Sequence, residues 1–149
     1  MTVAPHPDVD TLRTGAELEV GPASLSPDPV VVGPLSPQVD LQVAVEGGVV
    51  LDLTEGGVPL LGVAVDADEV RLSVPGGSGS RLPSRPDGDG VVRLRLLLDA
   101  GVVELFTGGA TAAARLRPSG GEISLGIAGD RPGARLRGLV AHAMERVVG

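Results

Sequence analysis

The chain contains no cysteine, tryptophan, tyrosine or lysine, and Phe106 is its only large aromatic residue. Without cysteine it can form neither a disulfide nor a thiolate metal site, and cysteine usage leaves the redox compartment undetermined. A nucleic-acid partner would require a basic stripe with stacking aromatics, whereas the net charge is −7. The composition therefore argues against nucleic-acid binding and indicates that the acidic charge serves solubility.

Long apolar runs are also missing from the sequence. No stretch approaches the roughly 18 unbroken apolar residues of a membrane span. The segment 1–13 has neither the basic start nor the apolar core of a secretory signal peptide. We therefore expect no membrane partner and no signal peptide in this sequence, and the localisation stays open.

Glycine and proline are abundant, with 23 and 13 residues spread along a chain of 149. A chain of this length favours one domain with a single core. The apolar residues are almost all valine, leucine and alanine, and branched side chains suit the pleated surface of a sheet. Turn residues that recur at such short intervals indicate short strands rather than long helices.

Strict alternation of apolar and polar residues predicts a half-buried strand at 39–46, with Val39 and Val45 at the two ends of its apolar face. A second clear strand is expected at 91–98. Further strands are expected at 49–53, 60–66, 69–74, 102–106, 111–116 and 123–127. The segment 75–90 is rich in Gly, Ser, Pro and Asp and is expected to form the longest loop.

The two ends of the chain are less regular. Residues 1–15 are Pro-rich and aperiodic, so we interpret them as a connector and assign 16–149 to the folded domain. In 136–148, Leu139 and Ala143 fit a helical face, while the neighbouring pattern favours one more strand, which we expect. About ten strands with tight turns predict an all-β fold, an antiparallel two-sheet β-sandwich of jelly-roll or concanavalin-like type.

Two acidic clusters are candidate calcium sites, one with Asp66, Asp68 and Glu69 and the other with Asp87 and Asp89. A helix–loop–helix calcium loop needs further oxygen ligands at its fifth and twelfth positions, which neither cluster supplies. Because Asp side chains accept hydrogen bonds from nearby backbone amides in turns, we interpret both clusters as turns. No metal site is predicted.

Asp99 and Glu104 are close enough in sequence that a catalytic pairing of the two carboxylates stays open. Asp99 stands where a turn-starting Asp belongs and Glu104 is a polar residue of an alternating strand, so structural roles are favoured. His6 in the connector and His142 near the end have no imidazole or carboxylate placed to complete a metal site or a triad. With no cysteine and no Gly-x-Ser-x-Gly motif, the sequence offers no nucleophile.

Sugar binding by β-sandwiches often uses exposed aromatic rings that cover the apolar side of a sugar. Phe106 is the only candidate ring, and we expect it to fill the core. Sugar binding would then depend on polar contacts alone.

Residues 5–13 contain a motif that includes Pro7, Leu12 and Arg13. The motif resembles the P-x-P-E-L-x-x-L-R connector that joins the catalytic propeller of glycoside hydrolase family 32 to its C-terminal β-sandwich. Asp and Val stand here in the places of Glu and Leu.

Residues 94–106 resemble the sandwich signature of the same family, in which Leu-Arg and three apolar residues precede D-x-S-x-apolar-E-apolar-F. Asp99, Glu104 and Phe106 match its fixed residues, and Gly101 replaces the serine. The resemblance implies that these three are fold-defining, with Asp99 bonding turn amides and Phe106 in the core. It also places His142 where the family often has an aromatic residue.

The family cleaves β-fructosidic bonds in a five-bladed propeller, with motifs such as W-M-N-D-P-N-G, R-D-P and E-C that are absent here. The resemblance thus implies no catalytic residue, no cofactor and no enzymatic activity for this chain alone. We expect a non-catalytic C-terminal module of a fructan- or sucrose-cleaving enzyme. Its partner would be the propeller or a second copy, and it would give structural support, shape substrate access or promote oligomerisation. The alternative is a free-standing lectin-like domain that binds fructan or sucrose-type carbohydrate.

Overall fold

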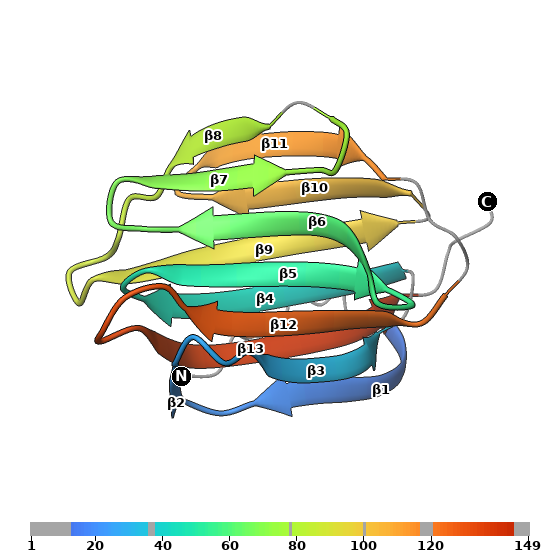
Figure 1. Ribbon diagram of the computed structural model, residues 1–149, viewed down its shortest axis with the longest axis horizontal. Coiled ribbons are helices and arrows are strands. Elements are labelled where there is room, and N and C mark those ends of the chain that lie inside the picture. Colours follow the sequence, from blue (N-terminus) through green and yellow to red (C-terminus); the bar gives the residue numbers. More distant parts are fainter. Residues whose placement is uncertain (1–12, 36–37, 78, 100, 117–120, 145–149) are drawn as a thin grey trace.

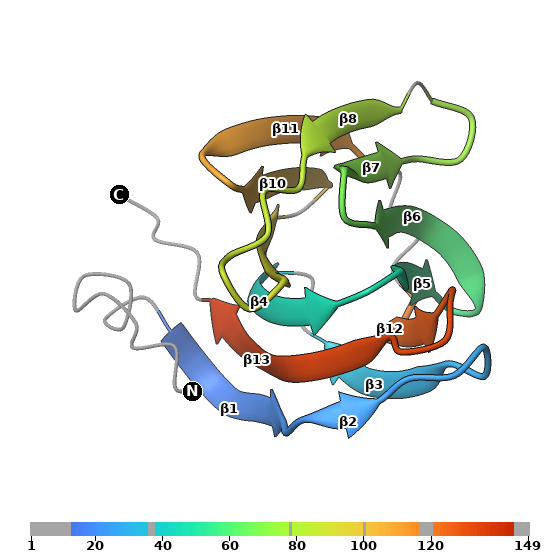
Figure 2. The ribbon, with the colours of Figure 1, turned by 90° about the vertical axis from the view of Figure 1, so that its left-hand side faces the viewer.

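The computed structural model describes residues 13–35, 38–77, 79–99, 101–116 and 121–144. All regular structure in these segments is β-strand, arranged in two antiparallel sheets that lie face to face (Figure 1). Figure 2 shows the two layers side by side, with the sheet that contains β4 and β13 on the left and the sheet that contains β5 and β6 on the right.

The first layer is sheet A, in which most strands that lie side by side are not consecutive in the sequence. In spatial order it contains β1 (Arg13–Val20), β13 (Arg135–Met144), β4 (Gln38–Glu46), β9 (Val91–Asp99), β10 (Val102–Thr107) and β11 (Ala110–Arg115), and β2 (Ala23–Ser24) pairs with β13. The second layer, sheet B, contains β3 (Val30–Leu35), β12 (Ile123–Gly129), β5 (Val49–Glu55), β6 (Val58–Val65), β7 (Glu69–Ser73) and β8 (Ser80–Pro83).

The core lies between the two sheets and consists of aliphatic side chains. Successive residues of a strand point to opposite faces, so alternate residues of each strand meet in the middle of the sandwich. The largest fully buried side chains are Leu41, Leu51, Leu96, Leu105, Leu125, Ile127, Leu136 and Leu139. Complete burial of one such side chain contributes about 1.5–3 kcal/mol, so the inner faces hold the two layers together.

The prediction of an all-β sandwich is confirmed, and so are the clear strands at 39–46 and 91–98. The C-terminal segment forms strand β13 as expected, and its helical alternative is wrong because Leu136, Leu139 and Ala141 face the core of a sheet. The structure has more strands than the alternation predicts.

Four strands were missed, namely β1, β2, β3 and β8. Strand β3 contains Gly33-Pro34, β8 ends at Pro83 inside the expected loop 75–90, and β2 is only two residues long. Strand β1 begins at Arg13, before the expected end of the connector at residue 15.

Candidate functional site

A groove of about 890 Å³ lies on the outer face of sheet A. This is the face turned away from sheet B in Figure 2. Strands β1, β13, β4, β9 and β10 all contribute to it, together with the turn after β10. The polar and aromatic residues in its lining are Glu19, Gln42, Asp89, Arg93, Arg95, Phe106, Thr107, Arg135 and Arg137. We call this hollow the sheet A groove.

One continuous row of outward side chains crosses the floor of the sheet A groove. The pairing of the strands places each member opposite the next. From β1 to β11 the row is Glu19, Val140, Gln42, Arg95, Phe106 and Thr111. Adjacent strands are about 4.8 Å apart, so neighbours in the row are within reach of the same small ligand.

Arg95 is held in place at the centre of this row by Asp40. Its Nε donates to Asp40 Oδ1 at 3.0 Å and its Nη2 donates to Asp40 Oδ2 at 2.9 Å. Asp40 lies on the same outer face and is fully buried, whereas the side chain of Arg95 is 38% exposed. A bidentate pair of this kind fixes the plane of the guanidinium, so Arg95 presents its remaining donors in one orientation.

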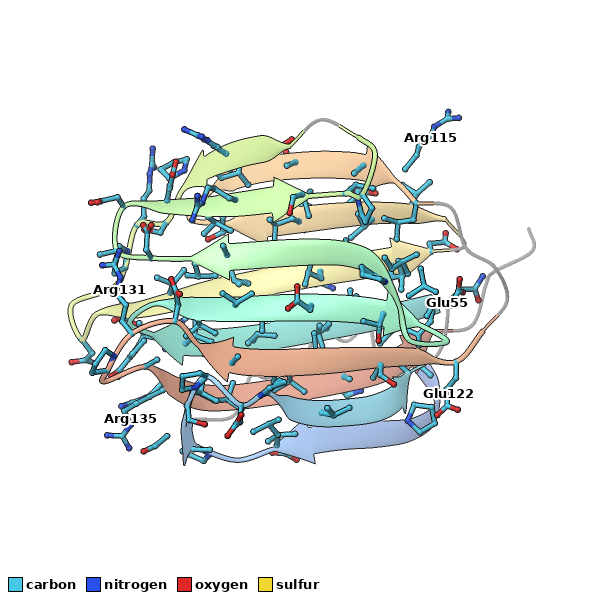
Figure 3. The ribbon with its side chains drawn as sticks, in the orientation of Figure 1. Glu55, Arg115, Glu122, Arg131 and Arg135 are labelled. Carbon is cyan, nitrogen blue, oxygen red and sulfur yellow. The ribbon has the colours of Figure 1, made fainter. Side chains whose placement is uncertain are left out.

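The other arginines of the groove are paired to different degrees. Arg137 donates from Nη1 to Glu46 at 2.8 Å, and Arg93 lies 3.5 Å from Asp87. Arg135 makes no ion pair with the described residues; Figure 3 shows it at the end of the sandwich opposite to Glu55 and Glu122. Exposed pairs such as these contribute little to stability.

Phe106 lies on the outer face, which corrects the prediction that it fills the core. Its side chain is half-buried and lines the groove, while Val103 and Leu105 of the same strand are the residues that enter the core. The reason is register, because Phe106 pairs with the outward-facing Arg95. The groove therefore has an aromatic surface that the sequence analysis placed elsewhere.

His142 has a carboxylate beside it that its position in the sequence does not reveal. It is the register partner of Asp40, which places the two side chains as neighbours on the outer face of sheet A. The pairing crosses from β13 to β4, so the spacing along the sequence gave no signal of it. Neither Asp40 nor His142 belongs to the lining of the sheet A groove.

Asp99 and Glu104 both lie on the outer face of sheet A but do not line the groove. Asp99 pairs with Val102 and Glu104 with Leu97, so the two carboxylates are diagonal neighbours across the β9–β10 hairpin. Both are exposed, and Gln38 Nε2 donates to Asp99 Oδ1 at 3.2 Å. No described cavity surrounds them, whereas glycosidic catalysis needs two carboxyls that flank a bound sugar.

Both acidic clusters form turns, as the sequence analysis interpreted them. Asp66 Oδ1 accepts from the backbone amides of Asp68 and Glu69, each at 2.8 Å. These amides hold the pKa of the Asp66 carboxyl below its ordinary value, that of Glu69 most strongly.

Asp87 makes an equivalent turn at the rim of the groove. Its Oδ1 accepts from the amides of Asp89 at 2.9 Å and Val91 at 3.1 Å. The amide of Val91 is the largest cause that lowers the pKa of Asp87, and Arg93 adds to it. Within the described segments no group of three His, Asp or Glu side chains could hold a metal ion.

The connector motif cannot be compared with the structure in full. Pro7, Leu12 and His6 lie outside the described residues, and Arg13 is the first residue of β1. The described part of the chain has no helical segment with the length and apolarity of a membrane span.

No family model and no curated protein matches the sequence of this chain. Solved structures do match its fold. A fructofuranosidase from Schwanniomyces occidentalis matches over 92% of this chain and 35% of its own, with a TM-score of 0.69 and 10% identity. The GH32 β-fructofuranosidase of Bombyx mori matches over 96% of this chain and 30% of its own, with a TM-score of 0.65 and 21% identity.

A galectin from Caenorhabditis elegans also matches, over 83% of this chain and 94% of its own, with a TM-score of 0.61 and 18% identity. At these identities the likeness establishes the fold, a β-sandwich that occurs in larger enzymes and as a small lectin. The chain spans about a third of the length of the two enzymes.

Proposed function

We propose that this chain is a non-catalytic β-sandwich module of a β-fructosidase-type glycoside hydrolase, equivalent to the C-terminal sandwich of such enzymes. The observation that carries the proposal is the coverage, because nearly all of this chain corresponds to about a third of each fructofuranosidase. The motifs at 5–13 and 94–106 support the same relationship. The module would pack against a catalytic domain and stabilise it.

The chemistry of the sheet A groove supports a non-catalytic role. Hydrolysis of a glycosidic bond requires two carboxyls, one to donate a proton and one to attack or to activate water. Asp40 and Glu46 are bound to Arg95 and Arg137, which is the arrangement of structural ion pairs. The paired carboxylates beside the groove therefore serve to orient arginines.

Exposed valines at one edge of sheet B support a contact with another domain. Strand β3 is an edge strand, and its Val30 and Val31 are 42% and 69% exposed. A catalytic domain that packed against this edge would remove both side chains from water and cover the unpaired backbone groups of β3.

The first test is hydrolysis by the purified chain. Incubation with sucrose, inulin and levan should release no fructose, while a fructofuranosidase run beside it should release fructose from sucrose. Release by the chain that is proportional to its concentration would contradict the proposal.

The second test is the gene that encodes the chain. The proposal predicts that the adjoining nucleotide sequence encodes a propeller with the acidic motifs of the family. Adding this chain to that propeller should then raise the midpoint of the propeller's thermal unfolding. An unchanged midpoint at saturating concentrations would contradict a supporting role.

A second candidate function is a free-standing carbohydrate-binding domain. Two observations favour it: the match to nearly the whole of a galectin, and the position of Phe106 in an open groove. An adjoining sequence without any catalytic domain would favour this candidate over the first.

A further inference from the structure

We infer that the sheet A groove is a binding site for a neutral oligosaccharide, with Phe106 beneath one sugar ring and with Arg95, Arg93 and Gln42 bonded to hydroxyl groups. This inference rests on the second candidate function and deepens it, because it names the binding site and the class of sugar; it concerns the groove of this chain whether or not a catalytic domain adjoins it.

The aromatic ring is the first observation. Phe106 is half-buried in the lining of the groove, beside the fixed guanidinium of Arg95. A half-covered ring offers one apolar surface to a ligand, and the C–H groups of a sugar ring match such a surface. Val140 lies three strands away from Phe106 in the same row and adds a smaller apolar contact.

The second observation is the supply of hydrogen-bonding groups. The two bonds to Asp40 use two of the five N–H donors of Arg95, which leaves donors that face the groove. Gln42 lies next to Arg95 in the row, and its amide can both donate and accept. Hydroxyl groups also donate and accept, so a polyol satisfies this mixture better than a purely anionic or cationic group does.

The charge balance argues for a neutral ligand. Four arginines line the groove, Arg93, Arg95, Arg135 and Arg137. Five carboxylates lie in the lining or bind these arginines: Glu19, Asp40, Glu46, Asp87 and Asp89. The site is close to neutral within a chain of net charge −7, so it offers an acidic glycan no net attraction.

The size of the groove fits a short oligosaccharide. Its volume of about 890 Å³ is within the usual range of roughly 300–1,000 Å³ for small-molecule sites. The distance from β13 to β10 across the row is about 14 Å, three spacings between adjacent strands. Several sugar rings can therefore contact the row at once.

The experiment is isothermal titration of the purified chain with four tetrasaccharides: nystose, maltotetraose, cellotetraose and, as the acidic member, a chondroitin tetrasaccharide. We expect at least one neutral tetrasaccharide to bind with a dissociation constant below about 1 mM and the acidic one to bind more weakly. Heat from none of the neutral tetrasaccharides, or tighter binding of the acidic one, would overturn the inference.

Variants then test whether the groove is the site. Phe106→Ala should weaken binding about tenfold or more, and Phe106→Tyr should retain it because the ring is kept. Val102→Ala is the matched control, since Val102 lies on the same strand and the same outer face, 42% exposed and outside the groove. Equal binding by Phe106→Ala and Val102→Ala would overturn the inference.

A second pair of variants keeps the test valid if Phe106→Ala unfolds. Arg93→Ala removes a groove donor whose side chain is 46% exposed, and Arg81→Ala removes an exposed arginine from β8 of sheet B. We expect weaker binding only for Arg93→Ala. The same loss in both variants would show that binding follows overall charge, which would contradict a defined site.

Discussion

The outer faces of the two sheets differ sharply, although their inner faces are alike. The outer face of sheet A carries a row with Gln42, Arg95 and Phe106, whereas the middle of the outer face of sheet B carries small residues. One row across sheet B consists of Val31, Gly126, Asp52, Gly62 and Ser73. Long side chains from four neighbouring strands line the groove of sheet A, whereas the long side chains Arg71 and Arg81 of sheet B belong to β7 and its edge strand β8.

The outer face of each sheet contains an aspartate, and the two aspartates differ in burial. Asp40 on β4 is fully buried under Arg95, while Asp52 on β5 is exposed. A groove with fixed polar groups needs buried partners that orient them. A face of small residues needs none.

The largest expected effect on stability is that of replacing Asp40, with the replacement of Asp52 as the comparison. Asp40→Ala should lower the free energy of unfolding by about 2 kcal/mol, because Arg95 loses its partner but can still reach water. Asp52→Ala should change it by less than about 0.5 kcal/mol. Urea denaturation followed by circular dichroism measures both, and equal losses would contradict the contrast between the faces.

The sequence could predict the inner faces better than the outer ones. In 39–46 and 91–98 the two faces differ in polarity, so alternation alone indicates which one is buried. In 102–106 apolar residues occupy both faces, with Val102 and Phe106 outward and Val103 inward, so the pattern could not place Phe106. The register of β10 with β9 places Phe106 on the outer face.

The groove itself could not be predicted from the chain. Its floor is formed by β13, β4, β9 and β10. Of these strands only β9 and β10 follow one another in the sequence. The Arg95–Asp40 pair joins positions 55 residues apart and depends on the register of β4 with β9. Register between distant strands is set by tertiary packing, which a single sequence does not display.

A smaller effect should come from filling space above a glycine on each outer face. A Cβ added at Gly138, in the groove, would meet nothing within 4 Å. At Gly62 on sheet B it would lie 3.3 Å from both Asp52 Oδ1 and Ser73 Oγ. Gly138→Ala should therefore raise the free energy of unfolding by about 0.5 kcal/mol, through the lower entropy of the unfolded chain.

Gly62→Ala should be less stable than Gly138→Ala, because its neighbours must move to admit the methyl group. Thermal unfolding of the two variants beside the parent protein gives the order. A reversed order would show that the space over the groove is not open.

The smallest effect concerns acid and compares the turn of Asp66, in sheet B, with that of Asp87, at the groove. Backbone amides hold the pKa of both carboxyls below the ordinary value of 3.8. The stability they add is complete above that ordinary value and is lost as the pH falls through the lowered pKa. Asp66→Asn and Asp87→Asn should each lose less stability than the parent between about pH 5 and pH 2.

Thermal unfolding midpoints across this pH range measure the effect, and a steeper loss in either variant would contradict the assigned direction. The two variants should differ in one respect. Asp87→Asn also removes the charge beside Arg93 and should alter sugar binding, whereas Asp66→Asn should leave it unchanged.

We expect the outer face of sheet A, and not that of sheet B, to recognise a ligand. Nuclear magnetic resonance of the ¹⁵N-labelled chain, titrated with the neutral tetrasaccharide that binds best, tests this claim directly. We predict that the amide shifts concentrate on β13, β4, β9 and β10 around Gln42, Arg95 and Phe106. Shifts centred on β5, β6 and β12 would contradict it.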